Sequence, residues 1–219
     1  KLFRYLDVDC VFDVGANVGQ YGQMLRRYID YRKRIISFEP NPVAYGKLQS
    51  AAAGDSLWQV EAIALGSVAG HSKFNAYELS DLGSFRHFSR SAHAPQTMTG
   101  SAVDVEVRTL SSYLAETKER WNFNRPFLKL DTQGFDLEVA KGAGAALSEF
   151  VGLQCEIAFQ TIYHDAPDYL TALQFFQSAG FVISRLVPIH DIHFPELVEM
   201  DVIMVRPDTV KLEKPTGDF

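Results

Sequence analysis

Short apolar runs alternate along the chain with longer helix-like stretches. The runs are rich in β-branched and aromatic residues, and they predict strands at about 10–14, 35–38, 57–63, 127–131, 151–157, 181–187 and 200–206. The stretches between them predict helices at about 18–30, 42–53, 109–120, 136–147 and 166–179. Strands that alternate with helices form a mainly parallel sheet with helices on both faces. The pattern therefore predicts an α/β fold.

Residues 67–108 interrupt this alternation. They are rich in Ser, Gly, His and Thr, and they predict two short strands near 72–77 and 103–107 around a loop at 80–101. A loop of that length inside a compact domain is usually functional or disordered. We therefore expect one domain over residues 1–206 with an insertion at about 67–108.

The C-terminal end departs from the alternation in a second way. The last two predicted strands are joined by residues 188–196, without a helix. Such a connection predicts that the final strand, at about 199–206, is antiparallel to its neighbours, as in many mixed sheets. Residues 207–219 are expected to form a polar tail.

Composition and charge narrow the functional classes. Of 219 residues, 47% are hydrophobic and 22% are charged, as in an average globular protein. The net charge of −6 argues against a nucleic-acid-binding face, which would be basic. No apolar run is long enough to span a membrane and no signal peptide opens the chain, so we expect a cytoplasmic protein. Cys10 and Cys155 lie in strand-like apolar runs and are expected to be buried thiols.

A glycine-rich turn follows the first predicted strand. Asp13 closes this strand, and Gly15 and Gly19 flank Asn17 in the turn. In open α/β sheets, ligands bind outside the carboxyl ends of the strands. The nicotinamide fingerprint requires glycine at its second position, where the backbone approaches a pyrophosphate. Because Asn17 occupies that position, the turn favours a nucleoside ligand without phosphates.

An acid ends the second predicted strand. Glu39 lies 20 residues beyond Gly19, at the place where an acidic side chain accepts hydrogen bonds from ribose hydroxyls. Asn41 is expected to cap the following helix, with Pro42 at its first position. Strand, glycine-rich turn, helix, strand and terminal Glu together predict a nucleoside site.

These segments resemble the FkbM family of S-adenosylmethionine-dependent methyltransferases. The matching stretches are residues 12–21 (FDVGANVGQY), 37–42 (SFEPNP), 62–66 (AIALG), 107–111 (VRTLS) and 128–142 (LKLDTQGFDLEVAKG). The resemblance implies the class I methyltransferase Rossmann-like fold, with a seven-stranded sheet of order 3-2-1-4-5-7-6 whose last strand is antiparallel. It also implies S-adenosyl-L-methionine as cofactor, with the methionine part near Asp13, Gly15, Asn17 and Gly19, the ribose at Glu39 beside Asn41, and the adenine near Ala62 and Ala64.

Two further carboxylates are candidates for catalysis. Asp131 ends the predicted strand at 127–131, and Glu156 lies at the end of the next one. Methyl transfer to a hydroxyl needs a base that takes the hydroxyl proton. Asp131 or Glu156 could be that base, or could orient a sugar-like diol. The family more often has Glu where this chain has Gln133, so the charge at that position is missing here.

Histidines and the insertion supply weaker candidates. His164 follows the fifth predicted strand and could reach the acceptor pocket as a base. His190 and His193 have a spacing that could bind a metal, but two histidines without further ligands do not predict a metal site. Residues 84–89 could form a lid over the acceptor, with Arg86 as an anion contact.

The sequence therefore predicts an O-methyltransferase that acts on a hydroxyl of a small molecule or glycan. Oxygen as the accepting atom rests on analogy with the family. One alternative is an NAD(P)-dependent oxidoreductase or epimerase, against which Asn17 argues. Another is a non-catalytic cofactor-binding domain, against which the intact Asp13, Gly15, Glu39 and Asp131 argue. The oligomeric state is not predicted.

Overall fold

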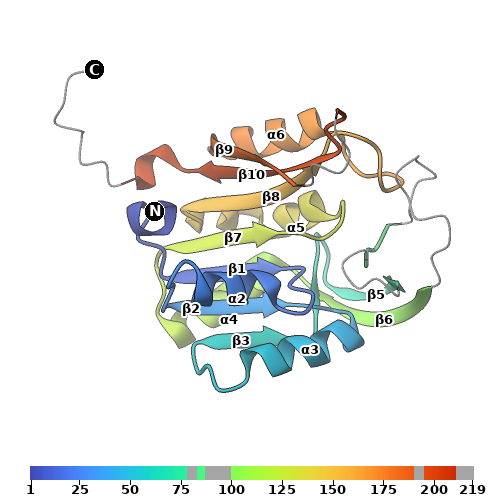
Figure 1. Cartoon of the computed structure of the whole chain (residues 1–219), viewed down its shortest axis with the longest axis horizontal. Coiled ribbons are helices and arrows are strands. Elements are labelled where there is room, and N and C mark those ends of the chain that lie inside the picture. The colour runs from blue at the N-terminus through green and yellow to red at the C-terminus, as the bar shows by residue number, and fades with distance from the viewer. Residues whose placement is uncertain (78–82, 87–99, 190–194, 211–219) are drawn as a thin grey trace.

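A seven-stranded sheet forms the centre of the computed structural model, which describes residues 1–77, 83–86, 100–189 and 195–210. The strand order is β3-β2-β1-β7-β8-β10-β9 (Figure 1). All neighbours are parallel except β10, which is antiparallel to both β8 and β9. The order and the antiparallel last strand expected from the resemblance are confirmed. The strands are β1 (Cys10–Val14), β2 (Arg34–Phe38), β3 (Trp58–Glu61), β7 (Pro126–Leu130), β8 (Gly152–Ala158), β9 (Val182–Pro188) and β10 (Glu199–Val205).

Helices cover both faces of this sheet (Figure 1). Alternate residues of β1 face opposite ways, so Val11 packs with Leu25 and Leu48 of one helical layer, whereas Phe12 packs with Leu114 and Phe176 of the other. All five residues of β1 and of β7 are buried, as expected for central parallel strands. The helices are α1 (Leu2–Tyr5), α2 (Gln20–Arg27), α3 (Pro42–Ala52), α4 (Leu110–Trp121), α5 (Asp136–Ala143) and α6 (Tyr169–Ser178), with 3-10 helices η2 (Gly144–Glu149) and η4 (Pro207–Thr209).

A second, three-stranded sheet stands beside the carboxyl ends of the main sheet (Figure 1). It contains β4 (Ala64–Leu65), β5 (Gly70–Tyr77) and β6 (Gly100–Arg108) in the order β4-β6-β5. Phe74, Val105 and Val107 form its small apolar core with Ala64. Both strands predicted within the insertion are thus present, and both are longer than predicted. The predicted loop lies mostly outside the described residues, as do His190 and His193.

Three predicted helix boundaries are wrong, where positive φ angles or a capping side chain set the end of the helix. The helix expected from residue 18 begins at Gln20, because Asn17 and Gly19 have φ of 48° and 90°, outside the helical region. The helix expected to reach residue 147 ends at Ala143, because Gly144 has φ of 51°, and a 3-10 turn continues from there. The helix expected from residue 166 begins at Tyr169, because the Asp168 side chain caps it by accepting from the amides of Leu170 and Thr171.

Both ends of the described chain pack on the domain. Residues 207–209, placed in the predicted tail, form η4. The Thr209 hydroxyl donates to the Val151 carbonyl (3.2 Å), and the Arg125 guanidinium donates to the Thr209 carbonyl (2.6 Å). Within the described part of the chain, every helix is too short or too polar to cross a membrane.

At Gly142, helix α5 lies so close to the backbone of Gly66 that there is no space for a side chain. A Cβ atom on Gly142 would lie 2.0 Å from the Gly66 carbonyl oxygen, whereas one on Gly46, in the middle of α3, would meet no atom within 4 Å. We expect Gly142→Ala to destabilise the protein by about 2 kcal/mol or more, because backbone must move to admit the methyl group. Gly46→Ala, the matched control, should stabilise it by about 0.5–1 kcal/mol. Urea unfolding measures both, and equal effects would contradict this account.

Candidate active site

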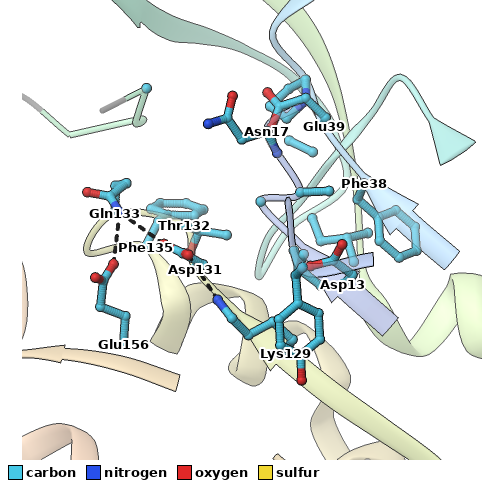
Figure 2. Close-up of a pocket in the computed structure, with 18 of the residues that line it drawn as sticks. Asp13, Asn17, Phe38, Glu39, Lys129, Asp131, Thr132, Gln133, Phe135 and Glu156 are labelled. Atoms are coloured by element: carbon cyan, nitrogen blue, oxygen red, sulfur yellow. Dashed lines mark hydrogen bonds and ion pairs between the residues drawn. The ribbon is translucent and has the colours of Figure 1, made fainter. Parts of the chain in front are cut away.

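A cavity of about 500 Å³ opens at the carboxyl ends of the central strands, against the second sheet. It brings together most of the predicted site residues, and Figure 2 shows the cofactor candidates on one side and the acidic cluster on the other. The predicted residues that line it are Asp13, Gly15, Asn17, Glu39, Ala64, Asp131 and Glu156.

The turn after β1 is held between two strands. The Gly15 amide donates to the Phe38 carbonyl of β2 (3.1 Å), and a Cβ on Gly15 would lie 1.9 Å from the Asp131 carbonyl oxygen. Gly15 also has φ of 79°, which an L side chain rarely adopts. Only glycine therefore fits at position 15, and the contacts with β2 and with Asp131 fix the turn beside the cavity.

Glu39 is fixed by this turn. Its two carboxylate oxygens accept from the backbone amides of Asn17 (2.8 Å) and Asn41 (2.8 Å). Burial raises the pKa of Glu39 to about 7, although both hydrogen bonds oppose the rise. Each oxygen keeps a further lone pair, so the carboxylate can accept two hydroxyl hydrogens from a diol in the cavity. The side-chain oxygen of Asn17 is buried without a hydrogen-bond partner among the described residues.

Asp13 lines the cavity at the end of β1 and is hydrogen-bonded to the neighbouring strand. Its carboxylate accepts from the Ser37 hydroxyl (2.9 Å), which in turn accepts from the Trp58 indole (3.0 Å). Burial raises the pKa of Asp13 to about 6, against the opposing charge of Lys129. The side chain thus links three strands beneath the turn.

Lys129 is the residue that the sequence interpretation missed and that the site most depends on. It is 5% exposed, and its ammonium donates to Asp131 (2.9 Å) and lies 5.6 Å from the centre of the Tyr21 ring. Burial alone would lower its pKa, but the adjacent carboxylates of Asp131 and Asp13 outweigh burial and raise it. The same ammonium holds the pKa of Asp131 below its usual value despite burial.

Gln133 joins the two predicted catalytic carboxylates. Its side-chain amide donates to Asp131 (2.9 Å) and to Glu156 (2.8 Å), as Figure 2 shows. Its side-chain oxygen accepts from the Tyr163 hydroxyl (2.8 Å). A Glu at this position, which the resemblance made the usual residue, has no hydrogens to donate to either carboxylate. The neutral amide is therefore what allows Asp131 and Glu156 to lie this close.

Glu156 and Asp131 differ in proton affinity. Burial raises the pKa of Glu156 well above its usual value, and the charges of Asp131 and Glu199 add to the rise. Glu199, on β10, has its pKa raised to about 7 by burial first and then by the charges of Asp131, Asp136 and Asp201. Glu199 and Asp201 line the cavity because β10 runs antiparallel beside β8, where Asp201 pairs with Glu156. No local motif in the sequence identified these two acids.

Four predicted site residues lie outside the cavity lining. Ala62 is exposed beyond the end of β3, while its neighbours Ile63, Ala64 and Leu65 line the cavity. Gly19 faces the side chains of α3, and the Asn41 side chain caps that helix. His164 is exposed on the loop after β8. The structure therefore does not bring His164 or Ala62 to the site.

The described part of the predicted lid is fastened to the cavity rim. The Ser84 hydroxyl donates to the Gln133 carbonyl (2.8 Å), and the Phe85 ring lies 4.8 Å from that of Phe135. The Arg86 guanidinium donates to the carbonyls of Gly134 and Asp165. Because these carbonyls occupy the guanidinium, Arg86 is not the free anion contact that the sequence predicted.

Comparison with known proteins decides the family. The family model of the methyltransferase FkbM domain matches residues 13–183. The chain belongs to the FkbM methyltransferase family. Among curated proteins none matches the chain.

Two solved structures share the fold at low identity. The FkbM methyltransferase from Methylobacillus flagellatus KT is 18% identical with a TM-score of 0.55, over 90% of this chain and 44% of that one. The fibrillarin/Nop5p complex is 10% identical with a TM-score of 0.50, over 90% of this chain and 72% of that one. This FkbM chain thus spans less than half the length of the Methylobacillus protein, and both similarities concern the fold.

We expect removal of the Lys129 ammonium to unfold the site. Lys129→Met leaves buried carboxylates unpaired, which should cost about 3–5 kcal/mol of unfolding free energy near pH 8. The cost should shrink toward pH 5.5. Asp13 and Glu199 have raised pKa values in the folded state, so their ionised forms destabilise the fold at pH values above their unfolded pKa. Protonation at lower pH removes this unfavourable charge.

Lys118→Met provides the matched control. Lys118 pairs with Glu149 at the surface, with 43% of its side chain exposed, so its loss should cost at most about 1 kcal/mol with little dependence on pH. Urea unfolding at several pH values measures both variants. If Lys129→Met lowered the unfolding free energy as little as the control does, and equally at every pH, the ammonium would not stabilise the carboxylate cluster.

Proposed function

We propose that this FkbM chain is an S-adenosylmethionine-dependent O-methyltransferase that acts on a hydroxyl of a small molecule or glycan. The observation that carries the proposal is one cavity with two chemically distinct ends. Glu39, fixed by two backbone amides, stands at one end, and the Asp131–Gln133–Glu156 cluster at the other.

The residues at the first end fit S-adenosylmethionine. Glu39 would accept the ribose hydroxyls, and the turn at Gly15 and Asn17 would hold the methionine part beside Asp13. Apolar side chains next to Glu39 suit the adenine ring; they are Phe38, Ile63, Leu65 and Phe74. A volume of about 500 Å³ lies within the usual range for small-molecule sites. When bound, this cofactor supplies an electrophilic methyl carbon.

The cluster at the second end suits a hydroxyl acceptor. A hydroxyl oxygen becomes a good nucleophile when a nearby base takes its proton. Glu156 fits that role, because its raised pKa gives it a high affinity for the proton once it is ionised. Asp131, held ionised by Lys129, would accept a hydrogen bond and orient the acceptor instead. We therefore assign the base to Glu156 and positioning to Asp131.

Cofactor binding is the first test. We expect calorimetry to detect S-adenosylmethionine binding, and Glu39→Ala to weaken it by at least about tenfold, since the ribose hydroxyls lose their acceptor. Glu119→Ala, a surface change on α4, should leave the affinity unchanged. No heat of binding by the unaltered protein would refute the proposed function.

Methyl transfer is the second test. With a hydroxylated acceptor found by following S-adenosylhomocysteine release, Glu156→Gln should lower kcat by about 10²-fold or more. Cofactor affinity should stay within about threefold, because Glu156 lies away from the Glu39 end. The rate of the unaltered enzyme should rise with pH as Glu156 ionises. A Glu156→Gln enzyme with unchanged kcat and pH profile would remove Glu156 as the base.

A further inference from the structure

A second cavity adjoins the acidic end of the first. Its volume is about 180 Å³, and Glu156 and Glu199 line both cavities. The stacked rings of Phe159 and Tyr169, with centres 4.7 Å apart, belong to its wall, as does Tyr163. An acceptor that reaches Glu156 therefore has room to extend into this second cavity.

The hydrogen-bond donors near this junction are already used. The side-chain amide of Gln133 donates to two carboxylates, and its oxygen accepts from Tyr163. The ammonium of Lys129 donates to Asp131. A ligand at the junction consequently meets carboxylate acceptors and must itself supply the donors.

The charge at the junction is uncompensated. Among the described residues, Lys129 is the single basic residue that lines the first cavity, and no Lys, Arg or His lines the second. The other acids of the second cavity are satisfied, since Asp136 accepts from Thr132 and Asp168 caps α6. The side chain of Glu199 has no hydrogen-bond or ion-pair partner in the part of the chain that the structure describes, and its charge adds to the cost of ionising Glu156.

An organic cation fits this junction better than a metal ion. No group of three or more His, Cys, Asp or Glu side chains among the described residues could hold a metal. The Glu199 carboxylate beside aromatic rings instead matches a protonated amine, which donates up to three hydrogen bonds and is attracted to ring faces. An anionic acceptor, such as a phosphate or carboxylate, would be repelled.

We propose that the acceptor carries a protonated amine beside the hydroxyl that is methylated, as in an amino sugar, and that Glu199 binds this ammonium where the two cavities adjoin. The inference rests on the proposed function, whose acceptor class it narrows. Bound to Glu199, the amine keeps its proton and so has no lone pair for the methyl group, whereas the neighbouring hydroxyl faces Glu156. Glu199 is thus a specificity-determining residue.

The test compares three sugars of one ring size and different charge. Glucosamine, glucose and glucuronate are titrated by NMR into the protein, with and without S-adenosylhomocysteine, at a pH above the pKa of Glu199, about 7, and below that of the sugar amine. We expect glucosamine to bind at least about tenfold more tightly than glucose, and glucuronate most weakly. Glu199→Gln should bring glucosamine and glucose within about threefold of each other, with glucose affinity unchanged.

Glu119→Gln is the matched control, because it makes the same change of net charge on the exposed face of α4. It should retain the preference for glucosamine. Equal binding of the three sugars, no binding by glucosamine, or a preference that survives Glu199→Gln would overturn the proposal. Calorimetry with the cofactor separates this from the proposed function: cofactor binding without an amine preference refutes the acceptor class alone, and no cofactor binding refutes the methyltransferase.

Discussion

The buried ammonium of Lys129 is the interaction on which the rest of the site depends. It lies between carboxylates from three parts of the sheet, Asp13 on β1, Asp131 after β7 and Asp201 on β10, and each of them raises its pKa. Unpaired charges are costly away from water, so carboxylates can be gathered here only around a cation. Lys129 sits in register with Asp13, in the central pair of strands, which places the cation where the neighbouring strand ends converge.

This arrangement gives two adjacent carboxylates opposite properties. Asp131 contacts the ammonium and stays ionised, whereas burial and like charge raise the pKa of Glu156 despite the opposing charge of Lys129. Gln133 holds both with one amide group, and Tyr163 fixes the orientation of that amide. The two neighbouring carboxyl groups therefore differ in charge state, as the proposed roles of positioning group and base require.

The cofactor end is organised differently, by backbone rather than by charge. The turn at Gly15 leaves no space for a side chain, and its amides and those after β2 hold Glu39 in place. The second sheet closes this end from the side, with Phe74 and Phe85 packed against each other and Phe85 against Phe135. The proposed nucleoside end, held by backbone, and the proposed acceptor end, governed by charge, share one cavity and come from different segments of the chain.

The sequence by itself determined the order of strands and helices, the glycine turn, and Glu39 and Asp131, because strand periodicity and strand-end motifs are local. It did not bring Ala62 or His164 to the cavity: a shift of one residue at a strand end turns Ala62 to solvent, and His164 lies on a loop whose course no local pattern fixes. No local pattern marks Lys129, because Asp13 and Asp201, which stabilise its charge together with the nearby Asp131, come from other strands. Only the tertiary structure decided the acceptor end: Glu199 reaches the site through the antiparallel pairing of β10 with β8, a contact between segments far apart in the chain that no local pattern encodes.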